Sequence, residues 1–553
     1  MEHLTPACSA RTKSALALLA AFLLAACTRI GSSTAPQATR DVVPGVVRIA
    51  LVGPFDNLIP ELAGNAASSD AAMFWGGWLL MVDGRGALEP DLALDVPSID
   101  NGGISKDGLT ITYHLRRRVT WQDGAPFDAR DVIFSWHAIM NPANNIISRA
   151  GYDDIASMTA PDPYTVKVQL KSPYAPAVAT FFAPGQAPYC ILPAHMLANL
   201  PDINRAAYDR LPVGTGPFIV TRYQPGIELD LAANPRYWRG PPKLKAIRFI
   251  TIPDSNTALV MMKTGDVDIW PEPPEALVPE LAKVAGVRVI HRPWNQFEYI
   301  GFNLTHAPLD DRNVRLALAM DVNRDLLVAN ILHGNGSVAN GDQPAYSWAF
   351  DPAARAPAYD PAGAAALLER SGWRVGRDGI RMKDGKRLAL EFVWSESDVN
   401  ASRFAPILQD AMRKIGVELD LKPFEHDLYY ATKETGGIVN SGKFDVSAQG
   451  WVGGVDPDNS SLWACAQRPP NGFNTTLLCD QRVDAAISVS LSTNDQAKRR
   501  AAYWRIQELL DRIVNVDFLY WVNRNDAVRN GLAGWDPAPS VTPFWNNWNW
   551  AWQ

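Results

Sequence analysis

The sequence predicts an α/β protein with mixed β-sheets. Two patterns point to this fold class. Short runs with apolar residues at alternate positions are typical of half-buried strands, and longer amphipathic segments that begin at capping residues are typical of helices. In the second half of the chain the two kinds of segment alternate, and no internal repeat of 20–50 residues is present. The expected strands are 45–52, 109–115, 165–170, 244–252, 388–394 and 417–421.

Local signals predict where the helices begin. Asp128 is a suitable N-cap for a helix that opens within 127–136, because its carboxylate can accept a hydrogen bond from the first turn. Asp360 followed by Pro361 predicts the start of a helix over 361–370, since proline is tolerated in a first turn. The remaining expected helices are 314–320, 402–415 and 496–513.

The composition is that of a large globular protein. The chain has 553 residues, of which 47% are hydrophobic and 20% charged, and this balance argues against disorder. A net charge of -6 without a long basic run argues against nucleic-acid binding. Eight histidines and five cysteines leave little material for a metal enzyme, so we expect neither a metal nor a cofactor. The 19 tryptophans indicate extensive stacking surfaces, in the core or in a ligand cleft.

The N-terminus is typical of an exported protein. Residues 1–26 read as a signal peptide, because a short basic region precedes the uncharged stretch 15–26, which is too short to span a bilayer. This stretch ends in Leu-Ala-Ala-Cys, which resembles a bacterial lipobox and makes Cys27 the expected lipid anchor. The alternative is an ordinary secretory signal with an incidental cysteine. Residues 27–43 are expected to form a flexible tether, so that the lipid alone holds the protein to the membrane, facing the periplasm or the cell exterior.

The remaining cysteines fit an oxidising compartment. Cys465 and Cys479 enclose 13 residues that include Pro469 and Pro470, and a loop of this size can turn back and close a disulfide. Metal binding is the alternative, but a cysteine pair without a neighbouring histidine is a weak zinc motif. Cys190 is expected to be a buried free thiol.

Five groups of motifs follow one another along nearly the whole chain. They are 113–116 with 119–127 and 129–132; 212–218; 234–238 with 252–254 and 265–269; 301–304 with 309–311 and 314–315; and 359–361 with 450–451 and 456–459. Each is weak alone. Together, in this order, they resemble the bacterial extracellular solute-binding family 5, the substrate-binding lipoproteins of peptide-type ABC importers.

This resemblance implies a periplasmic-binding-protein-like fold of type II, with two lobes joined by a hinge and an extra small domain. The ligand would be buried between the lobes, which close about the hinge. The expected parts are lobe I, residues 44–78 with 206–298 and 525–553; the small domain, residues 79–205; and lobe II, residues 299–524.

The resemblance also implies where a ligand lies. In peptide-binding members the bound chain adds to strand edges, and the matching positions here are Gly450, Trp451 and Val452. Those members carry an aspartate three residues after the tryptophan, which pairs with the α-ammonium of the peptide. This chain has Gly454 there, so either Asp456 or Asp458 substitutes from nearby or the ligand has no free amine.

Further residues are expected around the same cleft. Asn65 lies near the second inferred strand edge, and Trp394 is expected to stack on the ligand. Arg403 falls where some dipeptide binders present an arginine to the ligand carboxylate; the alternative is a surface arginine at a helix start. Three aromatic residues are expected to line the cleft floor: Phe74, Trp75 and Trp78.

The resulting prediction is a monomeric substrate-binding lipoprotein that captures a peptide or peptide-like solute and delivers it to an ABC permease. An enzyme is not expected, because no motif supplies a nucleophile beside a base. Two alternatives stay open. One is the same importer role for a non-peptide ligand, such as an oligosaccharide or another stackable solute. The other is a surface sensor or adhesin that uses the same fold.

Overall fold

The computed structural model describes residues 42–553, apart from 147, 186–187, 434 and 540–542. Residues 42–553 form one compact unit. The expected signal peptide, the lipid anchor Cys27 and nearly all of the expected tether lie outside the described residues. No helix in the described part of the chain combines the length and the apolar character that a membrane span requires.

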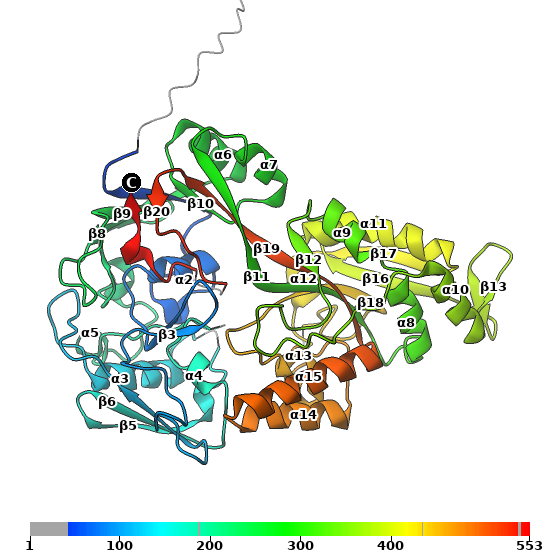
Figure 1. Ribbon diagram of the computed structural model, residues 1–553, viewed down its shortest axis with the longest axis horizontal. Coiled ribbons are helices and arrows are strands. Elements are labelled where there is room, and N and C mark those ends of the chain that lie inside the picture. Colours follow the sequence, from blue (N-terminus) through cyan, green and yellow to red (C-terminus); the bar gives the residue numbers. More distant parts are fainter. Residues whose placement is uncertain (1–41, 147, 186–187, 434, 540–542) are drawn as a thin grey trace, which may run out of the picture. The chain divides into compact units, whose positions relative to one another are not determined.

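One large mixed sheet runs through the unit (Figure 1). Its neighbouring strands are parallel in some pairs, such as β1 with β9, and antiparallel in others, such as β11 with β18, so the expected α/β fold with mixed sheets is confirmed. In spatial order the strands are β17 (Glu418–Phe424), β16 (Ala389–Ser395), β18 (Val446–Val452), β11 (Val287–Phe302), β19 (Val516–Arg529), β10 (Ile269–Pro271), β1 (Val46–Val52), β9 (Ala246–Ile252), β8 (Glu228–Ala233) and β7 (Phe218–Gln224), with β12 (Gly336–Val338) beside β19.

Two long antiparallel strands, β11 and β19, connect the halves of this sheet (Figure 1). The first half of β11, residues 287–293, pairs with residues 523–529 of β19, which lie next to β10. The second half of β11, residues 297–301, pairs with residues 516–521 of β19 and also lies next to β18. The register shifts between Pro293 and Phe297. Since proline donates no backbone hydrogen bond, the ladder is interrupted where the chain passes from one half to the other.

The helices begin where the capping residues predict. Asp128 caps α3, and its carboxylate accepts a hydrogen bond from Arg130 N, while Asp360 caps α10 in the same way toward Gly363 N. The longer helices are α2 (Ala66–Ala72), α3 (Ala129–Met140), α6 (Ser255–Thr264), α8 (Arg312–Met320), α9 (Arg324–Asn330), α10 (Pro361–Arg370), α11 (Val399–Lys414), α14 (Gln481–Ser492) and α15 (Gln496–Ile513). Short helices are α4 (Ala177–Thr180), α5 (Ala194–Leu197), α7 (Val278–Leu281), α12 (His426–Tyr430) and α13 (Ser460–Trp463).

Smaller sheets complete the unit. The strands β4 (Thr110–His114), β6 (Thr165–Leu170) and β5 (Ile155–Asp162) pair in that order, and helix α3 packs against β5 and β6. The other small sheets are β13 (Arg374–Val375) with β14 (Arg381–Lys383) and β15 (Lys386–Arg387), β2 (Leu80–Val82) with β3 (Leu88–Pro90), and β20 (Leu532–Ala533) with β21 (Ala551–Trp552).

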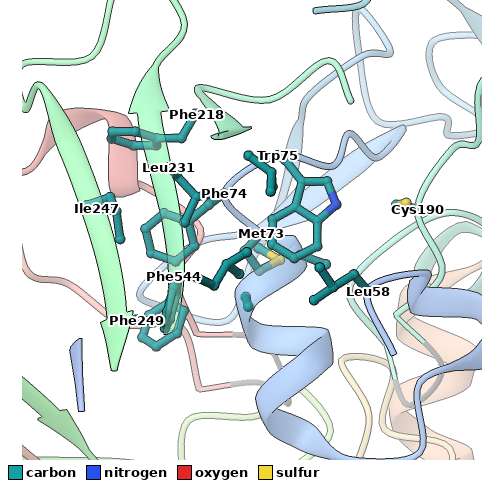
Figure 2. Packing of buried hydrophobic residues seen from close by; sticks show 14 of the residues in the cluster. Leu58, Met73, Phe74, Trp75, Cys190, Phe218, Leu231, Ile247, Phe249 and Phe544 are labelled. Carbon is teal, nitrogen blue, oxygen red and sulfur yellow. The ribbon is translucent and has the colours of Figure 1, made fainter. Parts of the chain in front are cut away.

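The aromatic residues that follow α2 belong to the core and do not line a cleft. Phe74 packs edge-on against Phe249 and Trp550, with ring centroids 5.2 Å and 5.6 Å apart, and Trp75 lies beside it (Figure 2). Phe74, Trp75 and Trp78 are all buried. The expectation that they form a cleft floor was wrong, because this helix end packs against the sheet and buries its apolar residues there.

Cys465 and Cys479 form a disulfide in the structure, with their Cα atoms 4.4 Å apart. Asp484 lies close to both sulfur atoms, and these three residues are the one group of potential metal ligands among the described residues. Because the two sulfur atoms bond each other, they have no thiolate to offer a metal in this state. Cys190 is buried as a free thiol in the cluster that contains Trp75 (Figure 2).

Candidate functional site

Two cavities flank the C-terminal end of strand β18. The first, about 480 Å³, is lined by Trp451 and Val452, and we call it the Trp451 cavity. The second, about 530 Å³, is lined by Gly450 and Val452, and we call it the Glu298 cavity after the acid on its wall. Successive side chains of a strand point to opposite faces, so Gly450 and Trp451 face different cavities. The expected residues Gly450, Trp451 and Val452 therefore all border open space.

The Trp451 cavity has an aromatic wall. The Trp451 ring lies 5.4 Å from the ring of Phe473, measured between centroids, and its Nε1–H donates a hydrogen bond of 2.9 Å to Asn459 Oδ1. Phe473 is 58% exposed, so it offers an unfilled apolar face. The opposite wall comes from the region of α4 and includes Tyr174 and Pro176. This arrangement can hold an apolar or planar group of a ligand between the walls.

The backbone after β18 is held against strand β11. Asn295 Nδ2 donates a 2.7 Å hydrogen bond to the carbonyl of Gly454, and the N–H of Gly453 donates one of 2.7 Å to the carbonyl of Asn295. A Cβ at Gly453 would lie 2.6 Å from Asn295 Nδ2, so a side chain here would displace Asn295 from its contact with Gly454. Gly454 itself lines the Trp451 cavity and presents no side chain to it.

Asp456 lines the Trp451 cavity but already has a cationic partner. Its Oδ1 accepts a 2.6 Å ion-paired hydrogen bond from Arg499 and a 3.3 Å hydrogen bond from the Tyr503 hydroxyl. The side chains of Arg499 and Asp456 are 8% and 13% exposed. A ligand ammonium would have to compete with Arg499 for this carboxylate, which makes Asp456 a poor substitute for the missing aspartate at 454.

Asp458 is the other carboxylate near this cavity. It accepts a 2.8 Å hydrogen bond from Ser460 N. Burial, followed by the charge of Asp456, raises its pKa. A carboxyl group in this position is more easily kept neutral than a solvated one, so it is suited to hydrogen bonding rather than to ion pairing.

The Glu298 cavity carries a buried acidic side chain. Glu298 is 7% exposed, and burial, followed by the charge of Asp398, raises its pKa to about 8. Burial also raises the pKa of Asp398, whose carboxylate caps α11 by accepting from Ala401 N. A Cβ at Gly450 would lie 2.5 Å from Glu298 Oε1, so glycine at this position leaves room for the acid.

Arg403 lies on the wall of the Glu298 cavity, near the start of α11. It is exposed. The structure thus brings Arg403, Gly450 and Val452 to one cavity and Trp451, Val452, Gly454 and Asp456 to the other. The contact between Arg403 and a ligand carboxylate stays a prediction.

Two of the expected site residues form hydrogen bonds within the fold. Trp394 is 6% exposed in the core, where its ring lies 5.8 Å from Phe392 and its Nε1–H donates to Ser402 Oγ at 2.9 Å. Asn65 is the N-cap of α2, and its Oδ1 accepts a 2.9 Å hydrogen bond from Ser68 N. The indole N–H of Trp394 and the side-chain oxygen of Asn65 therefore both form hydrogen bonds within the fold. This is expected, because buried polar groups and the free N–H groups of a helix start need hydrogen-bond partners.

Four residues that were not predicted from the sequence also border the two cavities: Glu298, Asp398, Tyr430 and Phe473. For Glu298 a signal was present: it is an acid inside the otherwise apolar run 297–302. Carboxylates are rare in buried strands because burying a charge is costly, so this position marks a candidate site. The other three residues reach the cavities only through tertiary packing.

The chain is similar to known proteins along most of its length. The sequence model described as bacterial extracellular solute-binding proteins, family 5 Middle, matches residues 87–473. The chain is 29% identical to the glutathione-binding protein GsiB of Salmonella paratyphi A, over 86% of this chain and 87% of that protein. It is 25% identical to the oligopeptide-binding protein AppA of Bacillus subtilis, over 96% and 97% of the two chains.

Among solved structures, that of NikZ from Campylobacter jejuni in complex with Ni(L-His) is similar, with a TM-score of 0.75 and 26% identity. The alignment covers 92% of this chain and all of that one. The family match spans more than half of the sequence, and the solved structure shares the fold along nearly its whole length. The chain therefore belongs to the bacterial extracellular solute-binding proteins of family 5.

Proposed function

We propose that this protein captures a peptide or peptide-like solute at the end of strand β18 and delivers it to the permease of an ABC importer. Relatives that are named for glutathione and oligopeptide binding support this ligand class. The expected absence of catalysis is part of the same proposal, and so is a monomeric state.

The observation that carries the proposal is an open strand edge. Strand β16 pairs with β18 only at Val446 and Ser447, whereas β11 pairs with β18 along its full length. Among the described residues, the stretch 449–451 therefore has a strand on one side and none on the other. An extended peptide can add there by main-chain hydrogen bonds, while the two flanking cavities receive its alternate side chains.

A non-peptide solute is the second candidate. Gly454 supports it, because the position offers no carboxylate for an α-ammonium and Asp456 is paired with Arg499. The aromatic pair Trp451 and Phe473 would then supply most of the contact, as for an oligosaccharide or another stackable ligand. A surface sensor that binds the same solute is distinguished from an importer by whether it binds a permease.

We further propose that β11 and β19 form a hinge between lobe I (44–78, 206–298 and 525–553) and lobe II (299–524). The interruption of their ladder between Pro293 and Phe297 supports this place for the motion. The small domain, residues 79–205, would stay with lobe I. The proposal also includes export, cleavage after residue 26 and anchoring through a lipid on Cys27.

Native mass spectrometry of protein purified from rich medium tests the proposed function. We expect a small solute to copurify with the wild type, because a cleft of this kind retains cargo, and we expect the Trp451→Ala variant to lose it. Trp504→Ala is a matched control, since Trp504 is an exposed tryptophan on α15 that lines neither of the two cavities. A solute that Trp451→Ala retains as well as the wild type does would contradict binding at this site.

A further inference from the structure

The Glu298 cavity carries acidic side chains that have no cationic partner in the described part of the chain. Glu298 and Asp398 both line it, and neither forms an ion pair with a lysine, arginine or histidine of the described residues. Glu275, the third acid on the wall, is already bonded, because its Oε2 accepts from Asn335 Nδ2 and Asn525 Nδ2. Arg403 reaches the cavity without pairing with any of the three.

Glu298 is buried with one oxygen left without a partner. Its Oε1 accepts a 2.8 Å hydrogen bond from Gln296 Nε2, whereas no described residue donates to Oε2. Gln296 lies two positions away on the same strand and is neutral, so it does not balance the charge. Ionising a carboxyl group that is 7% exposed without a cationic partner is costly, which agrees with the raised pKa of Glu298, and a bound cation would favour its ionised form.

A second unpartnered group lies in the same cross-strand row. Glu298 stands opposite Gly450 on β18 and opposite Tyr520 on β19, so the three positions share one face of the sheet. The Tyr520 hydroxyl is buried and has no hydrogen-bond partner within the described part of the chain. Burial, followed by the charges of Glu298 and Asp398, raises the pKa of the Tyr520 phenol.

We infer that Glu298 and Asp398 form a subsite for one cationic group, an ammonium or a guanidinium, of the bound solute. The cavity of about 530 Å³ is large enough for such a group with its aliphatic stem. Its hydrogen-bond donors would reach the free oxygen of Glu298 and the carboxylate of Asp398. The ring of Tyr430, 43% exposed on the same wall, offers a face to the cation.

This inference rests on the proposed function and moves amine recognition to a new place. The Trp451 cavity has glycine at 454, and the Glu298 cavity, on the other side of β18, carries a pair of acids. Gly450 contributes because a Cβ there would lie 2.5 Å from Glu298 Oε1 and would force the acid to shift. The cation can be the α-ammonium of the peptide or a lysine or arginine side chain, since the chemistry is shared.

Calorimetry with four sets of tetrapeptides tests the subsite and separates the two sources. The sets are acetyl-tetraalanine amide, tetraalanine amide with a free amine, and the acetylated peptide carrying one lysine or one Nε-acetyl-lysine at each position in turn. We expect one cationic set to bind the wild type roughly tenfold to a hundredfold more tightly than its neutral twin. Glu298→Gln and Asp398→Asn should each remove that preference while keeping the neutral affinity; asparagine also retains the cap of α11.

The matched control is Asp410→Asn, an exposed acid on α11 that pairs with Lys414 and should leave the preference intact. Neutral peptides that bind the wild type without any gain from a cation overturn the subsite and leave the proposed function standing. A cation preference that survives in both acid variants also overturns it. If no peptide binds, the peptide form of the proposed function is wrong, and the polyamine spermidine then tests the subsite. A rise in melting temperature with spermidine for the wild type but not for Glu298→Gln supports the subsite. Equal rises in the two proteins, or no rise in either, overturn the subsite.

Discussion

Replacing Asp456 by alanine should weaken the fold more than it weakens ligand binding. The substitution leaves Arg499, 8% exposed, without its carboxylate. Removing one partner of a buried ion pair typically costs 3–5 kcal/mol. Arg499 keeps its hydrogen bonds to Ser490 O and to the Tyr503 hydroxyl, and its guanidinium lies 5.3 Å from the Trp348 ring centroid. We therefore expect a smaller loss, about 2–4 kcal/mol of unfolding free energy.

Guanidinium denaturation of the mature chain measures this loss as a lower midpoint at an unchanged slope. The double variant Asp456→Ala with Arg499→Met should be less destabilised than the sum of the single variants by more than about 1 kcal/mol, because no unpaired charge remains. Asp410→Ala on the surface of α11 is the control and should leave the midpoint unchanged. An unaltered midpoint in Asp456→Ala, together with weaker binding of peptides with a free amine, would show that Asp456 serves the ligand and refute this reasoning.

Three further outcomes follow from other parts of the chain. Cys465→Ser should cost about 3 kcal/mol of stability, because the bond to Cys479 closes a short loop, and a non-reducing peptide map that finds both thiols free would contradict the pairing. Burial raises the pKa of Glu61 to about 8 from 4.5, so the folded state holds a proton that the unfolded state releases. Stability should fall as the pH rises from about 4.5 to 8, by up to about 1.4 kcal/mol per unit, and Glu61→Gln should flatten this dependence in denaturation curves. Cys27→Ser should release the mature protein from the membrane or leave an unprocessed precursor, and unchanged membrane retention argues against the lipid anchor.

The sequence predicted the features that depend on local chemistry. The expected helix starts at Asp128 and Asp360 are confirmed, because a cap is formed by a side chain and the backbone of the next turn. The strands at 45–52 and 388–394 appear within one or two residues of their expected bounds as β1 and β16. The order of the strands in the sheet was outside such reasoning, because it depends on contacts between residues far apart in the chain.

The candidate site was predictable only in part for the same reason. The resemblance to the family identified the end of β18, where Gly450, Trp451 and Val452 border the two cavities. It said nothing of Glu298, which reaches the site from β11 across the sheet. The position of Trp394 at a strand end did not reveal that its side chain is buried and donates its indole N–H to Ser402.

Hydrogen–deuterium exchange of the segment 446–455, with and without the solute recovered from the native protein, tests the central claim most directly. The claim is that the solute occupies the open edge of β18. We expect slower amide exchange in this segment when the solute is bound, because main-chain groups at 449–451 that now face no strand gain hydrogen-bond partners. Exchange in β7 and β8, at the far edge of the same sheet, should stay unchanged. A bound solute that leaves exchange over 446–455 unaltered would contradict the account.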